Sequence, residues 1–497
     1  MTYKLTIMKR MLTTMLGLLM LGISAVTMAA AEMPDWQNPQ VVQRNRLPMA
    51  TTFDAGGLNL SLNGMWKFNW NESIDVRPLD FYGLGYDDAA WDEIPVPGMW
   101  ELNGYGDPLY VNIGFAWRGH YENNPPYPAL EHNYVGQYRK TFVIDEKWDG
   151  KDIFLHIGSA TSNVRVWVNG KEVGYSEDSK LEARFDITKY VKKGENLIAL
   201  EIFRWCDGTY LEDQDFFRFS GIARDVYVYS REKKRLENVK VVASASGDAA
   251  LYAEVSKGVT AVSFDILDPS GKQVASTRVD VNTKSRSENG LPYVETKLNV
   301  PSVMQWTAET PSLYTLDVAV YDKKGQTEAT SIQIGFRDVE IVGGQLLVNG
   351  KPVLIKGVNR HEMNPYKGYV VSEADMIQDI LIMKQLNVNA VRTCHYPDDP
   401  LWYSLCDKYG LYMVAEANVE SHGMGYGEHT LAKDPQFELA HLERIRRAVQ
   451  RDFNHPSVIM WSLGNEAGDG PNFTKAYAMV KGMDASRPVH YERTFDY

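Results

Sequence analysis

The sequence predicts a multidomain protein in which an all-β jelly-roll sandwich and an immunoglobulin-like β-sandwich precede part of a (β/α)8 TIM barrel. Three observations support this prediction. The 497 residues are too many for one hydrophobic core, so we expect about three domains. Residues 58–229 and the following hundred or so read as short strands and turns without a helical period. After residue 341, strands alternate with helices, which indicates parallel βα units.

Residues 1–31 have the features of a secretion signal peptide. Lys4, Lys9 and Arg10 precede a largely apolar run at 11–28, and alanines follow at 29–31. A membrane anchor is the alternative, because the run is nearly long enough to span a bilayer. Its glycines and hydroxyl residues, and its small-residue end, favour cleavage. We therefore predict an exported protein, periplasmic or secreted, with no membrane association after cleavage near residues 30–32.

Composition narrows the class of protein. The chain is 44% hydrophobic and 23% charged, which is ordinary for a soluble globular protein. Its net charge of −12 argues against a nucleic-acid partner, which requires clustered lysine and arginine. The three cysteines form no disulfide framework, and we expect them to be small core residues.

Residues 32–231 are expected to form a sandwich or jelly roll with an N-terminal arm. Val164, Val166 and Val168 alternate with other side chains before Asn169-Gly170, a strong type I′ hairpin signal. A basic link at 231–235 leads into residues 232–341. There, alternating apolar residues precede turns at 268–271 and 322–325, a rhythm typical of an immunoglobulin-like sandwich.

Residues 342–497 carry the βα alternation. We expect strands at 353–358, 389–393, 411–415, 458–463 and 489–491, and helices at 373–386, 400–409, from Asp434-Pro435 onward, and 472–483. Ser372 and Asp375 suit a capping box at the start of the first helix. The expected core-facing residues are Met376, Ile377, Ile380, Leu381 and Met383 in the first helix and Leu439, Leu442, Ile445 and Val449 in the third. A closed barrel needs eight strands and typically about 250 residues, so we expect this sequence to be an incomplete record of a longer protein.

Polar residues follow every expected barrel strand. They occupy 359–362, 392–397, 416–423, 464–466 and 490–493. One such side chain alone is as well explained by a structural role; Glu466, for example, could simply stabilise a helix start. Five polar groups in succession at the same end of parallel strands instead indicate an active site.

Two chemistries fit these residues. Glu420 and His422 could join Glu466 around a divalent ion, as a mixed carboxylate–imidazole site. Alternatively, Glu466 is half of the carboxylate pair that glycoside hydrolysis requires. The two hypotheses are compatible if the metal lies beside the acid and orients it.

From about residue 35 to the end, the chain resembles glycoside hydrolase family 2, which includes the large bacterial β-galactosidases. The matching motifs are Tyr210-Leu-Glu-Asp-Gln-Asp215, Gly335-Phe-Arg-Asp-Val-Glu340, Lys356-Gly-Val-Asn-Arg-His-Glu362, Asn389-Ala-Val-Arg392, His395-Tyr-Pro397, Leu401-Trp-Tyr403, Asn418-Val-Glu-Ser-His-Gly423 and Ser462-Leu-Gly-Asn-Glu466. The resemblance implies a jelly-roll sugar-binding-like domain, an immunoglobulin-like domain and a catalytic barrel.

The resemblance also implies roles. Glu466 would be the general acid/base, and Glu420, His422 and Glu466 would hold a divalent ion, Mg²⁺ or alternatively Ca²⁺. The implied substrate contacts are Asn112, Asp215, His361, His395 and Asn465. The resemblance also implies a sodium ion near Asp215. Asn112 is the weaker match, because the loop after it differs in length, and a plain turn asparagine is the alternative.

One departure stands out. The family's nucleophile is a second glutamate several tens of residues beyond the acid/base, and the sequence ends before that place. The resemblance therefore implies a retaining exo-β-galactosidase, acting on terminal β-galactosides, whose 497-residue portion is inactive alone. Rival interpretations are a β-glucuronidase, a β-mannosidase or a non-catalytic glycan-binding protein. Related enzymes are often oligomers, so a homo-oligomer is expected for the full-length protein.

Overall fold

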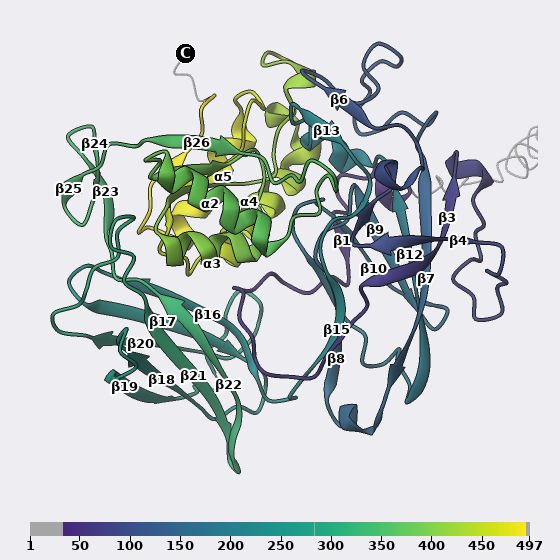
Figure 1. Ribbon diagram of the computed structural model, residues 1–497. Helices are drawn as coiled ribbons and strands as arrows, with labels where there is room; N and C mark the ends of the chain where they lie inside the picture. Colours follow the sequence, from purple (N-terminus) through teal and green to yellow (C-terminus); the bar gives the residue numbers. More distant parts are fainter. Residues whose placement is uncertain (1–32, 283, 494–497) are drawn as a thin grey trace, which may run out of the picture. The chain divides into compact units, whose positions relative to one another are not determined.

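The computed structural model describes residues 33–282 and 284–493, so the expected signal peptide lies outside the described residues. The described residues from Trp36 onward belong to one compact unit. Figure 1 shows two β-sandwiches and a group of helices around parallel strands within this unit. The predicted fold class is confirmed: a jelly-roll sandwich, an immunoglobulin-like sandwich and the first strands of a TIM barrel follow each other along the chain.

The jelly-roll domain is built on two antiparallel sheets. The seven-stranded sheet has the order β1-β10-β9-β12-β7-β3-β4, the four-stranded sheet has the order β11-β8-β15-β2, and two short ribbons pair β13 with β6 and β14 with β5. The bounds are β1 (Gln43–Arg44), β2 (Asn59–Ser61), β3 (Gly64–Asn71), β4 (Asp92–Val96), β5 (Gly98–Met99), β6 (Leu109–Val111), β7 (Val135–Ile144), β8 (Asp152–Ile157), β9 (Asn163–Val168), β10 (Lys171–Glu177), β11 (Ala183–Asp186), β12 (Gly194–Phe203), β13 (Phe216–Arg218), β14 (Gly221–Ile222) and β15 (Val226–Arg231).

The hairpin expected at Asn169-Gly170 joins β9 to β10. Both residues have positive φ, 50° and 77°, as a type I′ turn requires. Between the sheets lies a core of aliphatic and aromatic side chains, among them Trp66, Trp100 and Tyr138, each almost fully buried. Alternation along the strands therefore places one face of each sheet in this core.

The immunoglobulin-like domain consists of a three-stranded sheet, β16-β17-β20, and a four-stranded sheet, β19-β18-β21-β22. Both expected turns join neighbouring strands, 268–271 between β18 and β19 and 322–325 between β21 and β22. The strands are β16 (Leu236–Ala243), β17 (Asp248–Val255), β18 (Ala261–Leu267), β19 (Gln273–Asp280), β20 (Tyr293–Asn299), β21 (Tyr314–Asp322) and β22 (Gly325–Ile334).

The barrel portion has five parallel strands in the order β26-β27-β28-β29-β30, with helices between them. Its elements are β26 (Gly357–Arg360), α2 (Glu373–Gln385), β27 (Ala390–Thr393), α3 (Pro400–Tyr409), β28 (Tyr412–Glu416), α4 (Glu438–Asp452), β29 (Val458–Ser462), α5 (Pro471–Met483) and β30 (Val489–His490). A small antiparallel sheet precedes them, formed by β23 (Val339–Val342), β24 (Gln345–Val348) and β25 (Lys351–Pro352). The capping box at Ser372 and Asp375 is present at the start of α2.

The first barrel strand differs from the prediction. It begins at Gly357 and not at residue 353, because the chain leaving the Asn349-Gly350 turn first pairs with β24 as β25. The strand extends to Arg360, so His361 still follows its carboxyl end directly.

The predicted helix faces are partly wrong. In α2, Met376, Ile380 and Met383 are buried, but Leu381 is 46% exposed. In α4, Ile445 and Val449 are buried while Leu439 is exposed. The buried face of α4 instead includes three arginines, because they meet carboxylates of the jelly-roll domain: Arg444, Arg447 and Arg451.

The cysteines behave as expected, since Cys206, Cys394 and Cys406 are buried and unpaired. Within residues 33–282 and 284–493, no helix combines the length and apolarity needed to cross a membrane.

Candidate active site

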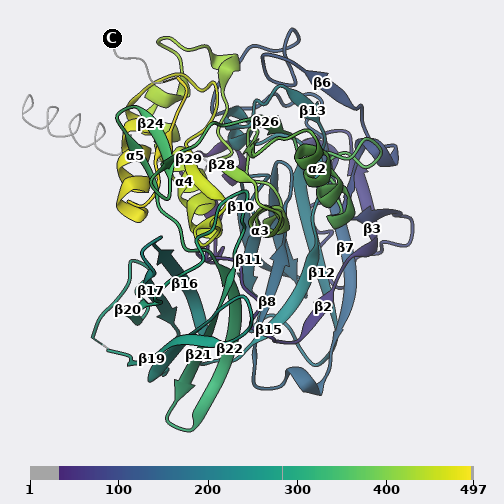
Figure 2. The same cartoon turned by 60° about the vertical axis from the view of Figure 1, so that its left-hand side comes forward.

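The polar groups predicted to follow the barrel strands do converge. Parallel pairing of β26 to β30 brings their carboxyl ends to one edge of the sheet. Figure 2 shows β28 beside β29, whose following loops carry Glu420 and Glu466. The strand order alone therefore places these two glutamates close together.

Glu466 is held by three side chains. Its Oε2 lies 3.1 Å from His422 Nδ1 and accepts a 3.0 Å hydrogen bond from the Tyr426 hydroxyl. Its Oε1 accepts a 2.9 Å hydrogen bond from Arg493 Nη2. Burial raises the pKa of Glu466, but the hydrogen bonds from these three groups outweigh it and leave the pKa below its usual value. The side chain is 33% exposed, so one side of the carboxylate faces solvent.

The backbone before Glu466 makes this placement possible. A Cβ on Gly464 would lie 2.6 Å from the carbonyl oxygen of Val419, so only glycine allows the two strand ends to approach this closely. Glu466 itself has φ of 39°, in the left-handed region, and its N–H donates to Glu492 Oε1 at 2.7 Å. Glu466 does not begin a helix, since α5 starts at Pro471, and its carboxylate lies against His422 instead.

Glu420, His422 and Glu466 form a cluster suited to a cation. One ligand atom from each lies within 4.8 Å of the others. Glu420 is 1% exposed, its Oε1 accepts from Asn465 Nδ2 at 2.8 Å, and its Oε2 has no hydrogen-bond partner. Burial raises the pKa of Glu420 well above its usual value. A buried carboxylate oxygen without a hydrogen-bond partner is unfavourable unless a cation compensates its charge, so the position suits a bound cation.

Behind this cluster, a second carboxylate organises the strand ends. Glu416 Oε1 lies 2.6 Å from His395 Nδ1, and Glu416 Oε2 accepts from Arg392 Nε at 2.8 Å and from the Ser462 hydroxyl at 2.5 Å. Arg392 Nη2 also donates to Asn465 Oδ1 at 2.8 Å. His395 and Asn465 are thus fixed in orientation by one shared network.

His361 lies on the other side of His395. Their ring centroids are 6.0 Å apart with nearly perpendicular planes, and His361 stacks on Phe216 at 4.1 Å. Burial, with smaller contributions from His395 and Lys180, lowers the pKa of His361 to about 4. His361 is therefore neutral at pH 7 and offers a neutral imidazole to a ligand.

The jelly-roll domain contributes Asp215. Its Oδ1 lies 3.2 Å from His422 Nε2 and accepts a 2.6 Å hydrogen bond from the Ile113 N–H. Asn112 is exposed beside Ile113, and its carbonyl accepts from Arg118 Nη1 at 2.9 Å. The structure thus brings Asp215 into contact with the site, whereas Asn112 lies next to a site residue without a side-chain contact of its own to the cluster.

Two contacts were missed by sequence reasoning: Tyr426 binds Glu466, and Asp213 Oδ2 accepts from the Gly423 N–H at 2.8 Å, 3.4 Å from His422 Nε2. Arg493, which belongs to the polar group expected after the fifth strand, also binds Glu466. Asp213 lies in the Tyr210–Asp215 motif, so its position two residues before Asp215 was a usable signal. Tyr426 is in a polar loop with no distinctive pattern.

Comparison with known protein families assigns the chain to an enzyme family. Three models of one family match consecutive parts of the chain: the sugar binding domain of glycosyl hydrolases family 2 at residues 60–232, a further family 2 domain at 222–337, and the family 2 TIM barrel domain at 339–496. The chain belongs to glycosyl hydrolases family 2.

Curated proteins similar to this chain include β-galactosidases. The chain is 38% identical to the β-galactosidase of Priestia megaterium, over 93% of this chain and 48% of the relative, and 41% identical to that of Photobacterium profundum, over 92% and 46%. It thus spans about half the length of the curated relatives it matches. Among solved structures, a β-glucuronidase from Ruminococcus gnavus in complex with D-glucaro-δ-lactam is 25% identical, with a TM-score of 0.72 and coverage of 89% of this chain and 74% of that one.

Proposed function

We propose that this chain supplies the general acid/base of a retaining exo-β-galactosidase, and that Glu466 is that residue. The observation that carries the proposal is that Glu466 is partly exposed to solvent whereas the neighbouring glutamates are buried. It stands one third exposed at the end of β29, within hydrogen-bonding distance of His422, while Glu416 and Glu420 beside it are 1% exposed. Similarity to β-galactosidases at 38–41% identity supports the galactoside.

In this proposal, Glu466 acts twice. Its protonated form donates a proton to the glycosidic oxygen as that bond breaks, and its carboxylate then takes a proton from the water that completes hydrolysis. A sugar ring over the exposed side of Glu466 would remove water from the carboxyl group. That desolvation would raise the pKa toward the range that a general acid needs.

His361, His395 and Asn465 are proposed to bind the galactose hydroxyls. His361 is held by Phe216, and His395 by Glu416. Asp215, with 37% of its side chain exposed, reaches the site from the jelly-roll domain and is the proposed neighbour of a sodium ion. Asn112 is proposed as a further contact from the same domain.

We also propose a divalent ion, Mg²⁺, on Glu420, His422 and Glu466. The unpartnered Oε2 of Glu420 and the mixed oxygen and nitrogen donors support it. When bound, the ion would neutralise the clustered carboxylates and restrain Glu466. Ca²⁺ is the alternative, although it prefers six to eight oxygen ligands.

Three glutamates near Glu466 already have other roles in this proposal. Glu416 binds His395 and Arg392, Glu492 accepts the N–H of Glu466, and Glu420 is the proposed ligand of the divalent ion. We therefore propose that none of them serves as nucleophile and that residues 1–497 alone do not turn over substrate.

A panel of aryl glycosides tests the proposal. The complete gene product should hydrolyse an aryl β-galactoside in preference to the matching β-glucuronide and β-mannoside, and residues 1–497 alone should hydrolyse none. Preference for the glucuronide would replace the galactosidase proposal by the second candidate, which the structural similarity to a β-glucuronidase favours.

Export is proposed from residues 1–31 alone. Fractionation of cells that produce the protein should place it in the periplasm or medium, with an N-terminus near residues 30–32. A protein that keeps residues 1–31 and stays in the cytoplasm would contradict this.

A further inference from the structure

The two histidines of the candidate site, His361 and His395, each leave one ring nitrogen available to a ligand. His361 follows β26, His395 follows β27, and their ring centroids are 6.0 Å apart. Nδ1 of each ring is bound to another side chain, whereas neither Nε2 has a hydrogen-bond partner within residues 33–282 and 284–493. Both side chains are partly exposed, and their Nε2 atoms are not enclosed as those of His422 and His441 are. A ligand can therefore reach Nε2 of both rings.

Tyr396 determines where His361 carries its proton. The Tyr396 side chain is fully buried, and its hydroxyl lies 3.3 Å from His361 Nδ1. No other hydrogen-bond partner of this hydroxyl exists in the described part of the chain, so its hydrogen is used only if Nδ1 accepts it. Burial raises the pKa of Tyr396 well above its usual value, which keeps the hydroxyl protonated. His361 is neutral at pH 7, so its single ring hydrogen lies on Nε2.

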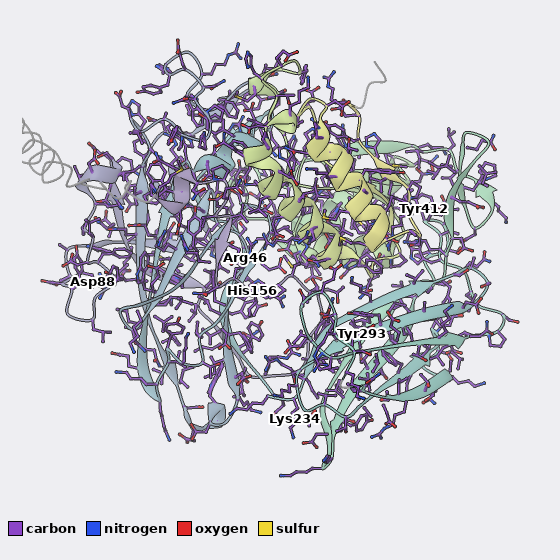
Figure 3. All side chains as sticks on the ribbon, turned by 180° about the vertical axis from the view of Figure 1, so that it is seen from behind. Arg46, Asp88, His156, Lys234, Tyr293 and Tyr412 are labelled. Atoms are coloured by element: carbon purple, nitrogen blue, oxygen red, sulfur yellow. The ribbon has the colours of Figure 1, made fainter. Side chains whose placement is uncertain are left out.

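Glu416 imposes the opposite arrangement on His395. Glu416 ends β28, the strand whose first residue, Tyr412, is labelled in Figure 3. Its Oε1 lies 2.6 Å from His395 Nδ1, and its Oε2 accepts from Arg392 Nε and the Ser462 hydroxyl. A carboxylate only accepts hydrogen bonds, so Nδ1 supplies the hydrogen of this contact. A His395 ring with one hydrogen therefore presents an unprotonated Nε2.

The two rings thus offer complementary groups to a ligand. The Nε2–H of His361 donates a hydrogen bond, and the Nε2 lone pair of His395 accepts one. A hydroxyl group both donates and accepts, so a sugar with neighbouring hydroxyls satisfies both rings. An ionised carboxylate has only acceptor atoms, so it would leave the lone pair of His395 facing a negative charge.

We propose that His361 and His395 form a donor–acceptor pair that selects a neutral sugar over a hexuronic acid, with Tyr396 and Glu416 as the positioning residues. The inference rests on the proposed function, because it assigns proton positions to two proposed galactose contacts. It gives a physical reason for the proposed preference for a galactoside over a glucuronide.

NMR spectroscopy of the chain labelled with ¹⁵N in its histidines tests the proton positions near neutral pH, because protonated and unprotonated ring nitrogens differ in ¹⁵N shift. His361 should carry its hydrogen on Nε2, and His395 should carry its hydrogen on Nδ1. The signals are assigned by their loss in His361→Gln and His395→Gln. A His361 ring protonated mainly at Nδ1, or a His395 ring protonated at Nε2, would overturn the proposal.

Tyr396→Phe tests the positioning role. Without the hydroxyl, His361 should populate both tautomers, while the His395 signals stay unchanged. In the complete gene product, the variant should lower kcat/KM for an aryl β-galactoside by up to about tenfold, through the loss of one neutral hydrogen bond. Tyr403→Phe, at an equally buried tyrosine on α3, should change neither the tautomers nor the rate. An unaltered His361 tautomer in Tyr396→Phe would contradict the role of Tyr396.

Calorimetry of the complete gene product with two monosaccharides tests the selectivity. Galactose should bind, and galacturonate should have a Kd at least about tenfold higher. No binding of galactose, or equal or tighter binding of galacturonate, would overturn the proposal. The aryl glycoside panel keeps the two proposals apart. Proton positions as stated without galactosidase activity would remove the proposed function alone, and galactosidase activity with other proton positions would remove this inference alone.

Discussion

The backbone of Glu420, in the barrel loop, pairs in parallel with the backbone of Glu212 in the jelly-roll domain. The Glu420 N–H donates to the Leu211 carbonyl at 2.9 Å, and the Asp213 N–H donates to the Glu420 carbonyl at 3.0 Å. The other side of Glu420 pairs with Asn465. The loop that carries two candidate metal ligands is therefore held between the jelly-roll domain and the strand end that carries Glu466.

An ion pair anchors this arrangement, and its removal should destabilise the protein. Arg444 Nη1 donates to Glu212 Oε1 at 2.5 Å, with both side chains buried. Because Arg444→Met leaves the Glu212 charge unpaired, we expect a loss of about 3–5 kcal/mol in the free energy of unfolding, measured in urea.

Arg446→Met is the matched control on the same helix. Arg446 pairs with Glu443 at 3.2 Å at a more exposed position, so its loss should cost at most about 1 kcal/mol. Equal losses in the two variants would contradict an anchoring role for Arg444.

Mg²⁺ should stabilise the chain through Glu420. At an ion concentration about a hundred times Kd, the stabilisation should reach about 2.7 kcal/mol, visible as a rise in unfolding temperature. Glu420→Gln should abolish this rise, because it removes a negative ligand. Glu428→Gln, at an exposed position in the neighbouring loop, should preserve it. An unchanged response to Mg²⁺ in Glu420→Gln would place the ion elsewhere.

The sequence was informative where structure follows from local pattern. Alternation of strands and helices predicted the parallel sheet, and the carboxyl ends of parallel strands meet, so Glu420, His422 and Glu466 could be placed together in advance. Asp215 came to the site only through the family resemblance, because its contact with His422 joins two domains.

The sequence could not predict contacts between polar side chains that lie far apart in the chain. The arginines of α4 look solvent-exposed in a periodicity argument, yet Arg444 is buried because Glu212 lies opposite it. Tyr426 likewise gains its role from Glu466, which is 40 residues away from it in the chain. No local pattern encodes such pairs.

Glu466→Gln in the complete gene product should reduce kcat/KM for a galactoside with a poor leaving group about 10²–10⁴-fold, because the amide cannot protonate the glycosidic oxygen. A dinitrophenyl galactoside should lose much less in the first step, since its leaving group needs no proton. Steady-state rates on the two substrates check this, with Glu428→Gln as control. An equal loss on both substrates would argue against the general acid role.

His361 should remain neutral through the physiological range. With its pKa lowered to about 4 by burial, its ring signals in NMR spectra should not titrate between about pH 5.5 and 8. Phe216→Ala opens the stacked face to water and should shift the titration upward, toward the ordinary histidine value of about 6.5. Phe217→Ala, which removes the next ring on β13, should have no such effect; a titration near pH 6.5 in the unaltered protein would refute the prediction.

The buried Glu101 should make the protein less stable as pH rises. Burial raises its pKa to about 7, although the Ser220 N–H donates to its Oε2 at 2.8 Å. The folded state therefore binds a proton that the unfolded state, with a pKa of about 4.3, releases earlier. The resulting contribution to stability is fully present below about pH 4.3 and is lost as the pH rises through 7, by up to about 3 kcal/mol.

Glu101→Gln should remove this loss. The free energies of unfolding in urea at pH 5 and pH 8 should therefore differ less for the variant than for the unaltered protein. Glu93→Gln, at a carboxylate whose side chain is 55% exposed, should keep the original difference. A pH dependence that Glu101→Gln leaves intact would assign the effect to another group.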